Sequence, residues 1–173
     1  MEDAHSAVLG LPDVSDNISW FAVFDGHAGS RVSTHCSGNL LDSILSQDLF
    51  KEALKEEHEL SEEELMERLK SGILSGFLSL DEKLRKIPEV AKGEDQGTTA
   101  VCALITEKYV LLSNCGDSRG VLSVKGDGSG GGSTPALATL DHKPSNTIER
   151  ERIQNAGGNV MIQRVNGSLA VSR

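Results

Sequence analysis

The stretch Trp20–Arg31, WFAVFDGHAGSR, constrains the fold more than any other part of the chain. Trp20–Phe24 is an unbroken apolar run with a β-branched residue inside it, which is typical of a buried strand. Helical spacing begins directly afterwards, with apolar residues at positions 32, 36, 40 and 44. Asp25, Gly26 and His27 therefore lie where a rigid strand ends, a place suited to holding a divalent cation beside a proton donor.

The length and charge of the chain exclude several classes of protein. Its 173 residues suffice for one domain with a substantial core. The net charge of −9 comes without a cluster of Lys and Arg, so we expect no nucleic-acid partner. No apolar run approaches the ~20 residues of a membrane span. Cys36, Cys102 and Cys115 lie in apolar contexts, which predicts reduced, buried thiols in a cytoplasmic or nuclear protein.

The first half of the chain predicts strands followed by helices. We expect a short strand at 6–11, the strand at 20–24, and a helix from about Ala28 to Ser46. Residues 51–64 are rich in Glu and Lys and predict a solvated loop that leads into a helix. Ser61 and Glu64 have the form of a capping box, and the apolar stripe that follows predicts a helix up to Pro88. Gly72 and Gly76 on that helix would permit close packing.

The second half predicts mainly strands. Runs at 98–105, 109–114 and 119–124 with short turns between them predict an antiparallel meander, and 135–140 an edge strand. The low-complexity loop at 126–134 lacks the Gly-Lys-Ser/Thr ending of a phosphate-binding loop, so we assign it no such role. Asn146 predicts a helix start and Gly157-Gly158 its end. Strands at 159–163 and 168–171 would flank a turn at Asn166-Gly167. The class is α+β with largely antiparallel sheets.

Four polar clusters are expected at strand ends, at Glu2-Asp3, Asp25–His27, Asp117 and Arg164. Carboxylate and carbonyl oxygens suit Mg²⁺ or Mn²⁺, and a pair of such ions can activate water for attack on phosphorus. An imidazole beside them could protonate a leaving oxygen, and an arginine could grip a phosphate. Each cluster also has a simpler explanation. Asp-Gly most often forms a turn, a single His commonly packs at a helix start, and the others could be solvated surface charges.

Five motifs in order along the chain resemble the metal-dependent protein serine/threonine phosphatases, the PPM or type 2C family, most closely the animal alpha/beta-type members. The resemblance covers essentially the whole chain. Each motif is weak alone, but five in the same order are highly specific. They are MEDAH (1–5), FDGHAG (24–29), NCGDSRG (114–120), DHKPSN (141–146) and IQNAGGNVMIQRVNGSLAVSR (153–173).

The resemblance implies a four-layer α/β/β/α sandwich, of antiparallel sheets flanked by helix pairs, with metals in a cleft at one end. By motif, Asp25 would bridge two Mn²⁺ or Mg²⁺ ions and the Gly26 carbonyl would bind one of them. Glu2 would support the second ion through water, with Asp3 beside it. The remaining roles also follow by motif: His27 would be the general acid, Asp117 would help to hold a weaker third ion, and Arg164 would lie near the substrate phosphate.

The implied reaction is direct attack of metal-bound water on phosphoserine or phosphothreonine, without a phosphoenzyme. No cysteine lies in a CX5R motif, which disfavours a cysteine phosphatase. The implied partners are phosphoproteins, and we expect a monomer.

The chain departs from the family pattern at both ends. The family arginine that precedes the MED motif, the ALGD motif, and the later aspartates of the first metal site have no counterpart in residues 1–173. We therefore expect a partial phosphatase domain that is unstable and nearly inactive in isolation.

Two other functions compete with the phosphatase. An inactive phosphatase-like binding module is the alternative, although the retained Glu2, Asp25, Gly26, His27 and Asp117 favour descent from an active enzyme. The second alternative, a nucleotide-binding protein that uses the glycine-rich loop, is excluded because the loop lacks the required lysine.

Overall fold

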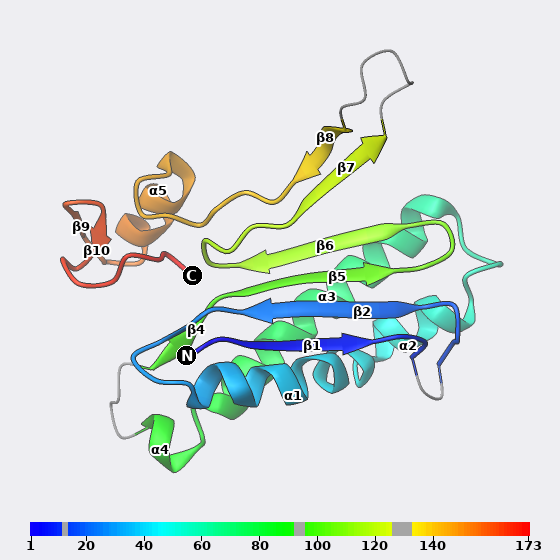
Figure 1. Ribbon diagram of the computed structural model, residues 1–173, viewed down its shortest axis with the longest axis horizontal. Helices are drawn as coiled ribbons and strands as arrows, with labels where there is room; N and C mark the ends of the chain where they lie inside the picture. The colour runs from blue at the N-terminus through cyan, green and yellow to red at the C-terminus, as the bar shows by residue number, and fades with distance from the viewer. Residues whose placement is uncertain (12–13, 92–95, 126–132) are drawn as a thin grey trace.

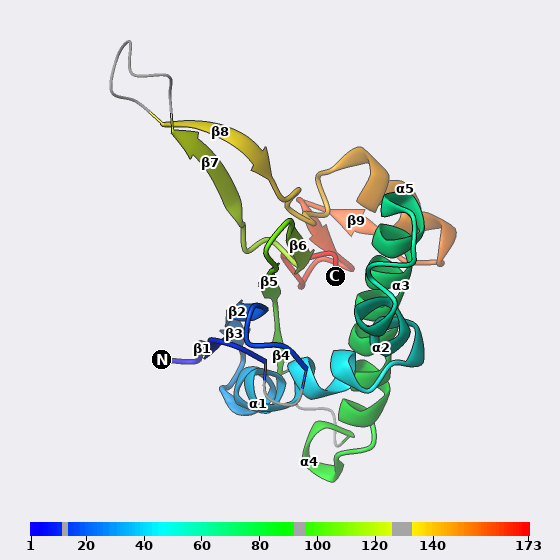
Figure 2. The same cartoon turned by 90° about the vertical axis from the view of Figure 1, so that its right-hand side faces the viewer.

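The protein, seen here as a computed structural model, is described for residues 1–11, 14–91, 96–125 and 133–173. Its centre is a four-stranded antiparallel sheet of order β1-β2-β5-β6. These strands are β1 (Ala4–Val8), β2 (Ser19–Phe24), β5 (Ala100–Ile105) and β6 (Val110–Cys115). Helices α1 (Arg31–Leu45) and α3 (Glu62–Leu84) cover one face of this sheet (Figures 1 and 2). The predicted α+β class, a sandwich built on antiparallel sheets with packed helices, is confirmed.

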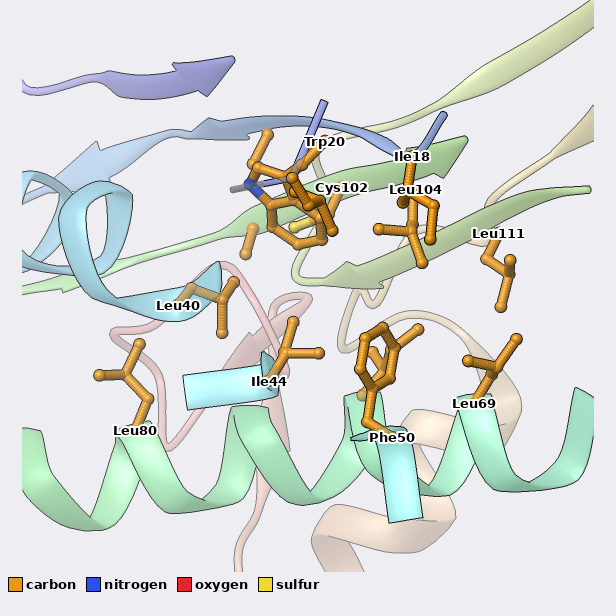
Figure 3. Close-up of a cluster of buried hydrophobic side chains, with 14 of the residues drawn as sticks. Ile18, Trp20, Leu40, Ile44, Phe50, Leu69, Leu80, Cys102, Leu104 and Leu111 are labelled. Atoms are coloured by element: carbon orange, nitrogen blue, oxygen red, sulfur yellow. The ribbon is translucent and has the colours of Figure 1, made fainter. Parts of the chain in front are cut away.

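Strand β2 is buried on one face only. Trp20, Ala22 and Phe24 are at most 3% exposed, whereas Phe21 and Val23 are 38% and 51% exposed. The unbroken apolar run predicts a buried strand, but side chains alternate across a strand and only the helix-facing set enters the core. Figure 3 shows Trp20 of this set lying above the side chains that rise from the helices.

Helix α3 is approached closely at two of its glycines, by α1 at Gly76 and by Phe50 of the helix that follows α1 at Gly72. A Cβ at Gly76 would lie 2.6 Å from Ile44 Cγ1, and one at Gly72 would lie 2.6 Å from Phe50 Cβ. The Ser43 hydroxyl donates to the Gly76 carbonyl at 2.9 Å across the same contact. The prediction that these glycines permit close packing is confirmed.

The capping box of α3 is also confirmed. The Ser61 hydroxyl accepts from the Glu64 amide at 3.3 Å, and the Glu64 carboxylate accepts from the Ser61 amide at 3.2 Å. The helix ends at Leu84, and Pro88 begins the short helix α4 (Pro88–Ala91) rather than ending α3.

Besides the short α4, the sequence prediction lacks one further helix. Residues expected to form a solvated loop contain most of α2 (Asp48–Lys55), whose Phe50 and Ala53 are fully buried against α3. The helix has only eight residues and is strongly charged, so the apolar stripe of Phe50, Ala53 and the half-buried Leu54 is too short to be recognised by its periodicity.

The predicted three-strand meander is correct only in part. Strands β5 and β6 pair with each other, but β7 (Val121–Lys125) pairs with β8 (Ser133–Ala138) in a separate two-stranded sheet. This hairpin projects away from the four-stranded sheet (Figures 1 and 2). Most of the glycine-rich loop predicted between these strands lies outside the described residues.

The last part of the chain contains helix α5 (Thr147–Asn155) and a small hairpin of β9 (Val160–Met161) and β10 (Arg164–Val165). The α5 start is as predicted, because the Asn146 side chain accepts from the Ile148 amide at 3.1 Å. The expected hairpin turn is displaced. Residues 162 and 163 turn between β9 and β10, while Asn166-Gly167 forms a second turn that closes the bridge from 165 to 169.

The three cysteines are free, as predicted. Cys36 and Cys102 are buried and Cys115 is half-buried. Burial raises the pKa of the Cys36 thiol to about 12, so it stays neutral at ordinary pH. Within the described residues, no helix combines the length and the apolar character that a membrane crossing requires.

Candidate metal and phosphate site

Four of the predicted site residues line one cavity of about 290 Å³. They share its wall with Thr99 and with residues 168–171. The four are Asp25, His27, Asp117 and Arg164. Segments separated by more than a hundred residues in sequence thus bring two carboxylates, an imidazole and a guanidinium to a common space.

Asp25 follows β2 directly, and its backbone is fixed by Thr99. The Asp25 amide donates to the Thr99 hydroxyl at 3.2 Å, and the Thr99 amide donates to the Asp25 carbonyl at 2.9 Å. Thr99 is only 2% exposed, whereas Asp25 is exposed. A rigid, buried threonine therefore holds an accessible carboxylate at the end of the sheet.

Gly26 is needed because the backbone of the first residues comes very close to it. A Cβ at position 26 would lie 2.2 Å from the Glu2 carbonyl oxygen and 2.8 Å from the Ser33 hydroxyl. The Ser33 hydroxyl in turn donates to that same Glu2 carbonyl. The Glu2 backbone is thus anchored beside Gly26, although the side chains of Glu2 and Asp3 are exposed and neither lines the cavity.

The His27 side chain packs against the backbone of Gly97. The short strands β3 (Gly26–His27) and β4 (Gly97–Thr98) pair so that His27 is opposite Gly97. A Cβ at Gly97 would lie 2.5 Å from His27 Nε2. The half-buried imidazole therefore depends on the glycine for its place in the cavity wall.

Asp117 lies in the loop 116–120, which connects β6 to β7. The neighbouring Ser118 hydroxyl is 2.6 Å from the Thr99 hydroxyl, so Thr99 contacts both carboxylate-bearing segments. Gly116 has a φ of +107°, and a Cβ there would lie 2.6 Å from Thr99 Cγ2. Only glycine fits this left-handed position so close to the threonine.

Arg164 reaches the cavity from β10. Its Nη1 donates to the Ser168 carbonyl at 2.6 Å, and the side chain is exposed. A guanidinium carries five N–H donors, so this bond leaves others for an anion in the cavity.

The oxygen donors at the cavity fit a hard divalent cation, and they form part of a site. Asp25 and Asp117 supply carboxylates, whereas Gly26 does not line the cavity itself. In the described part of the chain, no three side chains of His, Cys, Asp or Glu come together as a metal cluster.

Sequence reasoning missed the neutral residues that hold this site together, chiefly Thr99, Ser118 and Ser33. The doublet Thr98-Thr99 at the start of a strand is a weak signal in itself. Its importance comes from the hydrogen bonds of Thr99 to Asp25 and Ser118, which lie 74 and 19 positions away in the sequence.

Comparison with known proteins decides the family. The family model described as "Protein phosphatase 2C" matches residues 1–173. The chain belongs to the protein phosphatase 2C family. The resemblance found in the five sequence motifs is thereby confirmed.

Relatives in this family are named protein phosphatases. Mouse protein phosphatase 1B is 50% identical over 174 residues, which cover all of this chain and 42% of the mouse protein. Human protein phosphatase 1A is 49% identical over the same length, again 42% of that protein. The chain thus spans about two-fifths of the length of these phosphatases.

Solved structures support the same fold. A serine-threonine phosphatase 2C from Toxoplasma gondii superposes with a TM-score of 0.71 at 23% identity, covering 91% of this chain and 55% of that one. A C. elegans sex determining protein superposes with a TM-score of 0.69 at 28% identity, covering 98% of this chain and 39% of that one.

Proposed function

We propose that the chain carries part of the catalytic centre of a metal-dependent protein serine/threonine phosphatase. The observation that carries this proposal is the single cavity lined by Asp25, His27, Asp117 and Arg164. Membership of the protein phosphatase 2C family supports it, because the relatives are named protein phosphatases. The substrates would be phosphoserine and phosphothreonine in proteins.

Each residue of the cavity would have the role that its chemistry allows. Two Mg²⁺ or Mn²⁺ ions and a weaker third would be held by Asp25, Asp117 and the Gly26 carbonyl. Glu2 and Asp3 would lie at the edge of the site. The ions, when bound, would supply Lewis-acid activation of the attacking water. His27 would donate a proton to the leaving serine or threonine oxygen. Arg164 would bind phosphoryl oxygens with the N–H groups that Ser168 does not engage.

The 173-residue chain would act as a partial domain with low turnover. It spans about two-fifths of the length of mouse protein phosphatase 1B and human protein phosphatase 1A. The resemblance to the family implies further carboxylates of the first metal site that residues 1–173 do not supply. We propose a monomer in the cytoplasm or nucleus. The alternative is an inactive module that binds phosphoproteins, which the same cavity would also permit.

Calorimetry with Mn²⁺ on this chain tests the proposal. We expect the chain to bind Mn²⁺ and Asp25→Asn to weaken the affinity at least about tenfold, because an amide cannot supply the charge of the carboxylate. Asp16→Asn is the matched control, since this exposed residue precedes β2 at its opposite end and should leave the affinity unchanged.

An assay of phosphate release distinguishes the phosphatase from the inactive binding module. We expect slow, Mn²⁺-dependent release of phosphate from a phosphothreonine peptide, abolished by EDTA and by Asp25→Asn. Peptide binding without any phosphate release, in a chain that binds no Mn²⁺, would support the binding module and refute the phosphatase. Robust turnover would instead refute the expectation that the partial domain is impaired.

A further inference from the structure

The loop 116–120 that carries Asp117 is held from two sides. One side is the contact between the Ser118 and Thr99 hydroxyls, which faces the Asp25 turn. The other side is a segment of four residues, 139–142, which follows β8. Figure 1 shows the chain returning from β8 past the end of β6 on its way to α5.

Hydrogen bonds close both ends of the loop onto this segment. At its start, the His142 amide donates to the Gly116 carbonyl at 2.9 Å and the Gly116 amide donates to His142 Nδ1 at 3.2 Å. At its end, the Thr139 amide donates to the Gly120 carbonyl at 2.9 Å and the Gly120 amide donates to the Thr139 hydroxyl at 3.0 Å. The loop thus has a fixed frame even though it contains no regular structure.

An ion pair fixes the middle of the loop. Arg119 Nε and Nη2 donate to the two oxygens of Asp141, each at 2.7 Å, in a bidentate arrangement. The Asp141 side chain is only 13% exposed, and Lys143 Nζ lies 3.1 Å from its Oδ2. Hydrogen bonds from Arg119 lower the pKa of Asp141 to about 2, so the pair stays charged at neutral pH. Bidentate pairs fix orientation as well as distance.

We propose that Asp141 is a positioning residue for the Asp117 carboxylate. Asp141 does not line the cavity; it acts through Arg119, which lies two residues after Asp117 in the same short loop. By fixing Arg119, it restricts the loop to the arrangement in which Asp117 shares the cavity with Asp25. This inference rests on the proposed function, because it assigns the held carboxylate to metal binding.

The test compares Asp141→Asn with two other variants of this chain. Asp141→Asn removes the charge at nearly constant size, and Asp141→Glu restores the charge. Asp81→Asn is the matched control, because it breaks a 2.7 Å ion pair between Asp81 on α3 and Arg85 directly after this helix, away from the cavity. Mn²⁺ affinity is measured by calorimetry, and hydrogen exchange of the Gly116 and Gly120 amides is measured in the metal-free protein.

We expect Asp141→Asn to weaken Mn²⁺ binding about tenfold, as loss of an outer partner of a metal ligand does. The exchange of both glycine amides should become about tenfold faster. Asp141→Glu should recover part of both effects, and Asp81→Asn should change neither. In an Asp117→Asn background, Asp141→Asn should cause no further loss of affinity, because the residue acts through Asp117.

In a chain that binds Mn²⁺, two results would overturn the inference. One is unchanged exchange at Gly116 and Gly120 in Asp141→Asn. The other is an equal loss of Mn²⁺ affinity with and without the Asp117 carboxylate, which would show a general structural effect. If the unmutated chain binds no Mn²⁺, the proposed metal function fails, and the inference about metal positioning falls with it even where the loop exchange changes as expected.

Discussion

At the scale of residues, His27 is the side chain whose proposed role is most easily separated from general stability. A departing serine or threonine oxygen is a poor leaving group and needs a proton, whereas p-nitrophenolate is a good one and does not. His27→Gln should therefore slow hydrolysis of a phosphothreonine peptide by about a hundredfold and that of p-nitrophenyl phosphate by much less. The measurement is the ratio of the two rates at saturating Mn²⁺.

Gly97→Ala supplies a second, independent variant for the same role. The added Cβ would lie 2.5 Å from His27 Nε2 and would displace the imidazole without removing it. The same change in the rate ratio is expected, and Gly38→Ala, where a Cβ meets nothing within 4 Å, is the control. Equal losses on both substrates in both variants would contradict a general-acid role.

The site residues that could be predicted from the sequence are those whose side chains can bind a metal ion, transfer a proton or bind a phosphate. Asp25, His27, Asp117 and Arg164 were predicted as a site, and the structure brings them to one cavity; their individual roles stay predictions. The residues that hold them in place could not be found in the same way. Thr99 is a neutral hydroxyl in an ordinary strand sequence, and its function comes from contacts with distant segments.

At the scale of elements, the close contact between α1 and α3 depends on Gly76 of α3. Gly76→Ala would place a Cβ 2.7 Å from the Ile44 Cα, which is backbone and cannot move aside easily. Such overpacking costs about 1–3 kcal/mol, which outweighs the gain of up to about 1 kcal/mol in helix propensity. We expect a net loss in the free energy of unfolding, measured by urea denaturation.

The control for this prediction is Gly38→Ala on α1, an exposed helical position with open space around it. There the propensity gain should appear alone, as a stabilisation of about 0.5–1 kcal/mol. If both variants were stabilised, α1 and α3 would not pack as closely as described.

Element boundaries were predictable where the signal is local. The capping box at Ser61 and the Asn146 cap both start helices as expected, because a cap acts within four residues. The pairing of β7 was not predictable in this way. Short turns favoured a meander, but the loop 116–120 between β6 and β7 is held by segment 139–142, and β7 then pairs with β8 instead.

At the scale of the whole molecule, one buried carboxylate joins the end of the described chain to α5. Glu149 is 2% exposed and accepts hydrogen bonds from Arg152, Ser172 and Arg173. The Ser172 amide also donates to the His142 carbonyl at 3.0 Å, next to the Asp117 loop. Glu149 thus links α5, the last residues and the frame of the candidate site.

The charge of Glu149 makes this link dependent on pH. Burial raises the pKa of Glu149, but hydrogen bonds from Arg173, Ser172 and Arg152 outweigh this effect and lower the pKa to about 2, from an ordinary 4.5. Because the pKa is lower in the folded chain than in the unfolded one, the stabilisation is complete above pH 4.5. It is lost as the pH falls toward 2.

Glu149→Gln should therefore lower the free energy of unfolding by about 2 kcal/mol at pH 7, the value of hydrogen bonds to a charged group. The difference between the variant and the original chain should shrink steadily as the pH is lowered from 5 to 2, because the original chain loses the same charge by protonation. Urea denaturation over this range measures both curves. Glu151→Gln, an exposed change on the same helix, should stay within about 0.5 kcal/mol throughout. Curves for Glu149→Gln and the original chain that run parallel down to pH 2 would show that the carboxylate charge does not hold the chain end to α5.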